Sequence, residues 1–257
     1  MPSNEPYPGT QAVMRAVALL KAFTDAQPEL GLTELARAAG LNKTTAFRML
    51  TALESAGLIA KNHETDAYRL GPEAIALGGR AIRANHLYLA SRPELEALAQ
   101  KTGETATLEV LTGGETLILD EVLSHYFIGA TPSIGTRWPA HATSTGKVML
   151  ADLPEDRLEV VLSGRLAKPT ENTIASQPAL KRELARVREQ GYAVGDEELE
   201  AGFVAVGAPV RNHEGRVVAA ISVGGPSVRL TSERIAELAP RVVQAAGRIS
   251  KKMGYII

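Results

Sequence analysis

Apolar residues near the N-terminus recur at three- and four-residue spacing, which predicts three amphipathic helices. They cover residues 11–23, 32–39 and 43–55. Gly40 follows the second helix directly, at a position where glycine commonly adopts a left-handed conformation. Asn42 precedes the third helix and can cap its first turn. Two helices joined by such a short turn indicate a helix-turn-helix.

Short extended runs follow the third helix. Residues 58–61 and 68–70 flank a polar turn and predict a β-hairpin, which would form the wing of a winged helix-turn-helix. A helical pattern returns over residues 72–89. We place the domain boundary in this helix, which gives three parts: residues 1–72, a linker helix at 73–90, and a larger domain at 91–257.

Strands and helices are mixed in the larger part, so the predicted fold class is α+β. Residues 105–111 and 116–122 flank Gly113-Gly114, a strong hairpin signal. Residues 203–210 and 216–223 predict a second pair of strands. Further helices are predicted at residues 92–101, 146–151, 154–162, 177–190 and 231–252.

Composition narrows the class of protein. Hydrophobic residues make up 45% of the 257 residues and charged residues 22%, as in soluble globular proteins. A net charge of -1 excludes a polycation that coats nucleic acid without discrimination. The absence of cysteine excludes disulfides and thiolate chemistry. The longest purely apolar run, residues 217–221, is too short to span a bilayer, and residues 1–10 do not form a signal peptide, so we expect a cytoplasmic protein.

The third helix is the candidate DNA-reading element, because hydroxyl and guanidinium groups near its start can bond phosphates and base edges. Residues 1–71 hold seven basic and seven acidic side chains, a balance that indicates modest affinity of each such domain for DNA. We therefore expect a dimer or tetramer that reads repeated half-sites. A winged helix that contacts proteins, or a small-molecule module without specific DNA binding, is the alternative. The predicted DNA contacts are Lys43, Thr44, Thr45, Phe47, Arg48 and Thr51, with Lys61 and Arg69 on the hairpin.

Enzyme functions are disfavoured. The run from Ser144 to Lys147 resembles a phosphate-binding loop, but His141 stands where the first glycine belongs and Val148 replaces the magnesium-binding hydroxyl. As a Ser-x-x-Lys nucleophile motif, it lacks a Ser-Asp-Asn partner sequence, and the Lys-Thr-Gly at residues 101–103 precedes the serine instead of following it. The five histidines are scattered without the spacing of a metal site. We therefore expect no catalytic residues, no metal and no cofactor.

Several motifs together resemble the IclR family of bacterial transcriptional regulators. They occur in the family's order and spacing along nearly the whole chain. The resemblance implies a winged helix-turn-helix, a linker helix that dimerises, and a C-terminal effector domain with a GAF-like fold. The segments that carry it are Leu32 to Leu53, Tyr68 to Gly71, Pro139 to Lys147, and the run from Gly191 to Val223, which includes Glu198, Gly202 and Ala208-Pro209-Val210.

The resemblance also implies an effector pocket on one face of the C-terminal sheet. Fold maintenance is the alternative role for each residue, and Glu198 could instead pair with Arg216 or Arg229. By position, the implied pocket residues are Phe127, Ile128, Trp138, His141, Ser144, Thr145, Gly146, Asp196, Glu198, Phe203, Ala205, Ser222 and Gly224.

Further expectations about partners and about the linker follow from this resemblance and from the residues. The helix that begins at Ser144 offers N–H groups and a positive dipole end, which favour an anion, so we expect a small organic carboxylate as effector. Operator DNA is the expected macromolecular partner, read by a homodimer or a tetramer. Gly78-Gly79 marks a place where the linker helix can bend.

Overall fold

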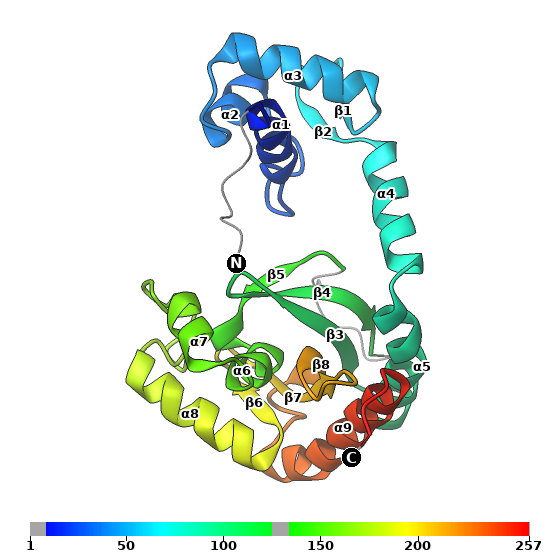
Figure 1. Cartoon of the computed structure of the whole chain (residues 1–257), viewed down its shortest axis with the longest axis vertical. Helices are drawn as coiled ribbons and strands as arrows, with labels where there is room; N and C mark the ends of the chain where they lie inside the picture. The colour runs from blue at the N-terminus through cyan, green and yellow to red at the C-terminus, as the bar shows by residue number, and fades with distance from the viewer. Residues whose placement is uncertain (1–8, 125–133, 257) are drawn as a thin grey trace. The chain divides into compact units, whose positions relative to one another are not determined.

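The computed structural model describes residues 9–124 and 134–256. It divides into two compact units, Met1–Ala84 and Asn85–Ile257, which are described separately below (Figure 1). The described residues of the N-terminal unit form a helix-turn-helix (α2 and α3), a hairpin and two further helices. Its elements are α1 (Gln11–Lys21), α2 (Leu32–Ala38), α3 (Lys43–Ser55), β1 (Ile59–Lys61), β2 (Tyr68–Leu70) and α4 (Pro72–Arg83).

The predicted helix-turn-helix is confirmed in its details. Gly40 has a φ of +64°, the left-handed conformation that ends α2. The side chain of Asn42 accepts a hydrogen bond of 2.8 Å from the backbone N–H of Thr45, so it caps α3 as predicted. A small core holds the unit together, and its fully buried members include Leu19, Leu35 and Leu50.

The linker is not one continuous helix, which corrects the helical prediction for residues 72–89. α4 ends at Arg83, and α5 (His86–Thr102) begins three residues later. Asn85 separates them because its side chain caps the new helix, accepting from the N–H groups of Leu87 and Tyr88 at 3.0 and 3.3 Å. The predicted linker at 73–90 therefore corresponds to most of α4 and the first turn of α5.

The C-terminal unit is built on a six-stranded antiparallel sheet in the order β5-β4-β3-β8-β7-β6, and its mixture of sheet and helices confirms the predicted α+β class. Sequence patterns did not predict the two edge strands, β5 and β6, because they are too short to show alternation. The strands are β3 (Thr105–Thr112), β4 (Glu115–Val122), β5 (Arg137–Pro139), β6 (Ala193–Asp196), β7 (Phe203–Arg211) and β8 (Val217–Pro226).

Helices cover both faces of this sheet. α5 and α9 (Ser232–Lys252) share one hydrophobic cluster with β3, β7 and β8. A second cluster joins α6 (Ser144–Ala151), α7 (Glu155–Val161) and α8 (Gln177–Gln190) to the other face. The neighbours Ala220 and Ile221 on β8 belong to different clusters, because successive side chains of a strand point to opposite faces.

α6 lies unusually close to the sheet. A Cβ atom at Gly207 on β7 would lie 2.9 Å from the backbone nitrogen of Thr145, and one at Gly195 on β6 would lie 3.2 Å from that of Ser144. The two glycines therefore allow the first turn of α6 to approach the strands. This close approach positions the start of α6 beside the polar residues of the sheet.

Candidate functional site

One face of α3 is polar and open to solvent, while the other packs into the core through Ala46, Leu50 and Leu53. Phe47 is 50% exposed despite its apolar ring. Thr45 is half-buried, and its backbone N–H donates to the side chain of Asn42 in the cap. The exposed residues on this face of α3, a helix labelled in Figure 1, form an open stripe that consists of Lys43, Thr44, Phe47, Arg48 and Thr51.

The two basic residues of the hairpin differ in whether they already have an acidic partner among the described residues. Arg69 on β2 is exposed. Lys61 on β1 lies 2.6 Å from a carboxylate oxygen of Asp66 and 5.8 Å from the ring centre of Tyr68. The hydrogen bond to Asp66 raises the pKa of Lys61. A phosphate that binds Lys61 must therefore compete with Asp66, whereas Arg69 is open to it.

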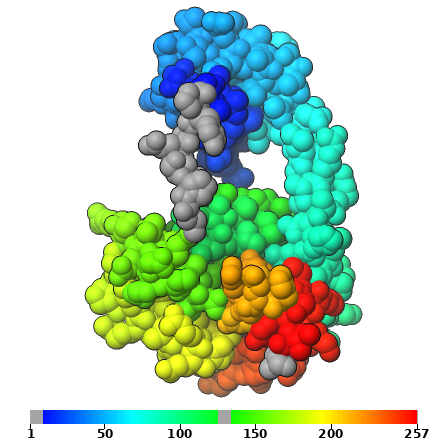
Figure 2. All heavy atoms as spheres, in the orientation of Figure 1, coloured from blue at the N-terminus to red at the C-terminus, as the bar shows by residue number. Residues whose placement is uncertain are grey.

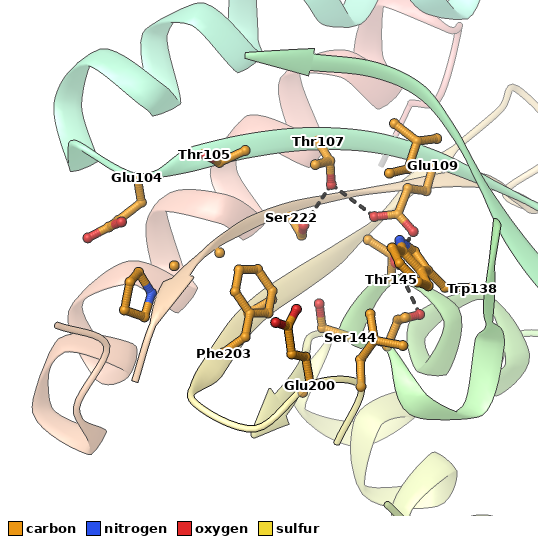
Figure 3. A pocket seen from close by; sticks show the side chains of 18 of the residues that line it. Glu104, Thr105, Thr107, Glu109, Trp138, Ser144, Thr145, Glu200, Phe203 and Ser222 are labelled. Carbon is orange, nitrogen blue, oxygen red and sulfur yellow. Dashed lines mark hydrogen bonds between the residues drawn. The ribbon is translucent and has the colours of Figure 1, made fainter. Parts of the chain in front are cut away.

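The C-terminal unit contains a cavity of about 340 Å³ on the face of the sheet that carries α6. Its walls come from all six strands of the sheet, the start of α6, and the loop before β7 (Figure 3). Polar side chains on the lining are Glu104, Thr105, Thr107, Glu109, Glu121, Ser124, Thr143, Ser144, Thr145, Glu200, Ser222 and Arg229, and the larger apolar ones are Ile118, Trp138, Leu199, Phe203 and Pro226.

A chain of hydrogen bonds crosses the cavity wall and ends on Glu109 of β3. The hydroxyls of Thr107 and Thr145 donate to its two carboxyl oxygens at 2.9 and 2.7 Å. Ser222 on β8 lies 2.8 Å from the Thr107 hydroxyl, as the dashed lines of Figure 3 show. Burial raises the pKa of Glu109, although both threonine hydroxyls oppose this shift. The chain links β8, β3 and α6 through one buried carboxyl group.

The other carboxyl groups on the lining differ in their surroundings. Glu104 holds Arg229 in a bidentate ion pair with two contacts of 2.7 Å. Burial, together with the nearby charges of Asp120 and Glu109, raises the pKa of Glu121 to about 7. Glu200 is exposed at the mouth of the cavity. The lining therefore carries several carboxyl groups and one guanidinium that is already paired.

Seven of the residues predicted for the pocket line this cavity. Phe127 and Ile128 lie outside the residues that the structure describes. The seven come from β5, the start of α6, β7 and β8, which are far apart in the sequence and meet only in the fold. They are Trp138, Ser144, Thr145, Phe203, Ala205, Ser222 and Gly224.

Four predicted residues lie elsewhere, which corrects their placement. The ring of His141 is buried and its Nε2 lies 2.7 Å from the carbonyl oxygen of Ala167, a structural contact. Gly146 packs against the backbone of Ala140, which leaves no space for a Cβ atom. Asp196 is exposed at the end of edge strand β6. None of these three residues lines the cavity.

Glu198 is the fourth, and its partner also differs from the expectation. One of its carboxyl oxygens lies 2.5 Å from Nζ of Lys147, and both side chains are buried. Neither proposed partner reaches it, because Arg229 pairs with Glu104 and Arg216 with Glu214. This buried ion pair joins α6 to the loop that follows β6.

The carboxyl groups of the cavity were missed at the sequence level. One signal was present, because Thr105, Thr107 and Glu109 alternate along β3 and so share one face. That alternation places polar groups where a core face would be apolar. Glu121, Glu104 and Glu200 gave no comparable signal, since only the fold brings them to the same cavity.

Comparison with known proteins decides the family. Residues 12–63 match the IclR helix-turn-helix domain, and residues 79–251 match the domain described as bacterial transcriptional regulator IclR C-terminal. The chain belongs to the IclR family. The family consists of transcriptional regulators, so the chain is a DNA-binding regulator that responds to a small-molecule effector, rather than an enzyme.

Named relatives and solved structures agree with this assignment. The HTH-type transcriptional regulator XynR of Escherichia coli is 35% identical over 96% of this chain and 99% of its own length. The E. coli transcriptional repressor IclR is 31% identical over 95% of this chain and 90% of its own. An IclR regulator from Alicyclobacillus acidocaldarius has a TM-score of 0.86 at 30% identity, covering 95% of this chain and 99% of that one.

One solved structure contains a ligand. An IclR homologue from Microbacterium hydrocarbonoxydans complexed with 4-hydroxybenzoate has a TM-score of 0.81 and 26% identity, covering 94% of this chain and 98% of that one. In the part of our chain that the structure describes, no helix is long and apolar enough to cross a membrane, and no three acidic or histidine side chains are grouped to hold a metal ion.

Proposed function

We propose that the open stripe of α3 enters the major groove of operator DNA, with Arg48 contacting base edges and the threonines contacting bases or phosphates. The observation that carries this proposal is the exposure of Lys43, Phe47, Arg48 and Thr51 on one side of a capped, well-packed helix. Arg69 on the hairpin would hold the flanking backbone, and Lys61 would do so after releasing Asp66.

The test is the affinity of Arg48→Ala for a promoter fragment at fixed salt. A bidentate contact from arginine to guanine contributes about 1–3 kcal/mol of discrimination, so binding should weaken roughly 5- to 160-fold. Arg157→Ala removes the same charge from an exposed position on α7 and serves as the control. Equal affinity of Arg48→Ala and Arg157→Ala would leave α3 without a role in DNA recognition.

We further propose that the effector is a small organic acid that binds in the cavity of the C-terminal unit. Ser144 and Thr145, the first residues of α6, line the cavity, so the positive end of that helix adjoins it. The homologue that binds 4-hydroxybenzoate supports an acid of this size. The effector can change operator occupancy only by binding the DNA-competent and incompetent forms with different affinity.

The cavity assignment is tested by thermal shift of the full chain with small organic acids, since a ligand of the folded state raises Tm by mass action. Ser222→Ala, and a bulky residue in place of Thr145, should reduce any shift. Unchanged shifts in both variants would place the ligand elsewhere.

We propose a homodimer, which can pair to a tetramer, acting in the cytoplasm where operator DNA is found. Exposed apolar side chains on α1 and α4 support this, among them Met14 and Ile75. Two recognition helices would then read a near-palindromic operator. Sedimentation analysis of Ile75→Glu tests the assembly, and an unchanged oligomeric state would exclude α4 from the interface.

A further inference from the structure

The charges on the cavity lining do not suit a simple anion. Among the lining residues that the structure describes, Arg229 is the only side chain with a full positive charge. It is held by Glu104 through two contacts of 2.7 Å. Glu109, Glu121 and Glu200 face the same space without a paired cation on the lining. A ligand that brought only a carboxylate would add to this negative charge.

The hydrogen-bonding groups point to the same conclusion. Thr107 and Thr145 each use their single hydroxyl hydrogen on Glu109. Ser222 then has to donate its own hydrogen to Thr107, because Thr107 has no second one to give. When Glu109 is ionised, the free positions on these three hydroxyls and on its carboxylate are therefore lone pairs. This part of the wall accepts hydrogen bonds and requires a ligand that donates them.

The start of α6 already has a negative group of its own. Thr145 is the second residue of α6, and its hydroxyl contacts the carboxyl group of Glu109. Glu109 thus lies where the helix dipole favours an anion. A ligand carboxylate that binds the first turn of α6 comes close to Glu109 and needs a positive charge nearby to offset the repulsion.

Aromatic rings complete the wall. Trp138, Phe203 and Glu200 all line the cavity, and their side chains are labelled in Figure 3. The faces of aromatic rings attract cations, by about 0.5–2 kcal/mol depending on exposure. An ammonium group has three donors and no acceptor, so it matches both the lone pairs and the rings.

We propose that the ligand of this cavity carries a protonated amino group that faces Glu109 and Glu121, so that the effector is a zwitterionic amino acid rather than a simple carboxylic acid. This inference rests on the proposed effector function of the cavity. The ligand's carboxylate adjoins the start of α6, and its ammonium group is bound by the carboxyl groups of β3 and β4.

Three ligands of nearly equal shape test the inference by isothermal titration of the full chain at pH 8, where Glu121, whose pKa is about 7, is ionised. They are 4-(aminomethyl)benzoate, 4-(hydroxymethyl)benzoate and 4-methylbenzoate, which differ only in the terminal group. We expect the amine to bind at least about tenfold more tightly than the other two, which corresponds to about 1.4 kcal/mol. Equal or tighter binding of the alcohol or the methyl compound would overturn the inference, and so would the absence of binding by all three.

Glu121→Gln identifies the residue responsible. This variant should lose most of the preference for the amine while keeping its binding of the two analogues that lack an amino group, because the amide retains the size but not the charge of the carboxylate. Glu189→Gln, at an exposed position on α8, is the matched control and should keep the preference. An unchanged preference in Glu121→Gln would contradict the assignment.

Operator binding without ligand separates this inference from the proposed function. If Arg48-dependent binding to promoter DNA persists while the amine is not preferred, only the charge of the effector has been assigned wrongly. If the amine is preferred but Arg48→Ala binds DNA normally, the DNA-binding proposal fails and the ligand class stands.

Discussion

Thr145 donates its hydroxyl hydrogen to Oε2 of Glu109 at 2.7 Å, which joins the first turn of α6 to the central strand β3. Both residues are buried, and they are 36 positions apart in the sequence. The contact ties the helix that bounds the cavity to the sheet that forms its wall. It therefore affects both the stability of the C-terminal unit and the properties of the cavity.

Thr145→Val should destabilise the C-terminal unit by about 1–3 kcal/mol, because it leaves a buried carboxyl oxygen without its donor. Urea unfolding followed by the fluorescence of Trp138 measures this, since Trp138 is the only tryptophan of the chain and lies on β5. Thr51→Val is the control on exposed α3 and should leave that transition unchanged. A transition of wild-type midpoint in Thr145→Val would contradict the predicted role of the contact.

The stability of the same unit should depend on pH through Glu121. Its pKa is about 7 in the folded chain, above the ordinary value of 4.5, because of burial and of the charges on Asp120 and Glu109. The folded state therefore holds a proton that the unfolded state has released between pH 4.5 and 7. The contribution of Glu121 should fall as pH rises through this window and stay constant above it.

The measurement is urea unfolding at several pH values for wild type and Glu121→Gln. The variant should show a smaller loss of stability between pH 4.5 and 7, because its amide does not titrate. Arg92 bonds Asp120 and the backbone carbonyl oxygen of Glu121, and it should be left unchanged in both proteins. Identical pH profiles would refute the shifted titration.

The buried pair of Lys147 and Glu198 gives a third prediction. Lys147→Met should cost about 3–5 kcal/mol at neutral pH, because it leaves the buried carboxyl group of Glu198 without its cation. Burial already raises the pKa of Glu198, and Lys147 opposes this shift, so the penalty should diminish in acid as the carboxyl group takes up a proton.

Lys181→Met is the matched control, since Lys181 forms a surface pair with Glu155 that should contribute less than about 1 kcal/mol. Chemical denaturation of both variants, again followed by Trp138, provides the comparison. Adding Glu198→Gln to Lys147→Met should recover part of the lost stability. If the two single variants were equally stable, the buried pair would have no special structural role.

Asn42→Ala removes the cap of α3 and should reduce the stability of the N-terminal unit by about 0.5–2 kcal/mol. The first turn of α3 carries Lys43, Thr44 and Thr45, so affinity for promoter DNA should fall as well. Hydrogen exchange of the α3 amides and a DNA titration measure the two effects. Thr33→Ala on exposed α2 is the control, and equal exchange in both variants would argue against the cap.

Local patterns in the sequence determined the elements of the N-terminal unit. Gly40, Asn42 and the apolar spacing of α3 are signals between near neighbours, so the helix-turn-helix and its open stripe could be predicted without coordinates. The resemblance to a known family added the place of the pocket. It did not show the break of the linker at Asn85, because a helical pattern on both sides concealed the cap.

Tertiary structure alone decided the chemistry of the cavity. Glu104 meets Arg229 from 125 positions away, and Ser222 meets Thr107 from 115. No periodicity connects such residues, because their contact depends on the order of strands in the sheet and on the close approach of α6. The sequence could therefore indicate that a pocket exists, whereas only the folded chain determined that carboxyl groups and lone pairs line it.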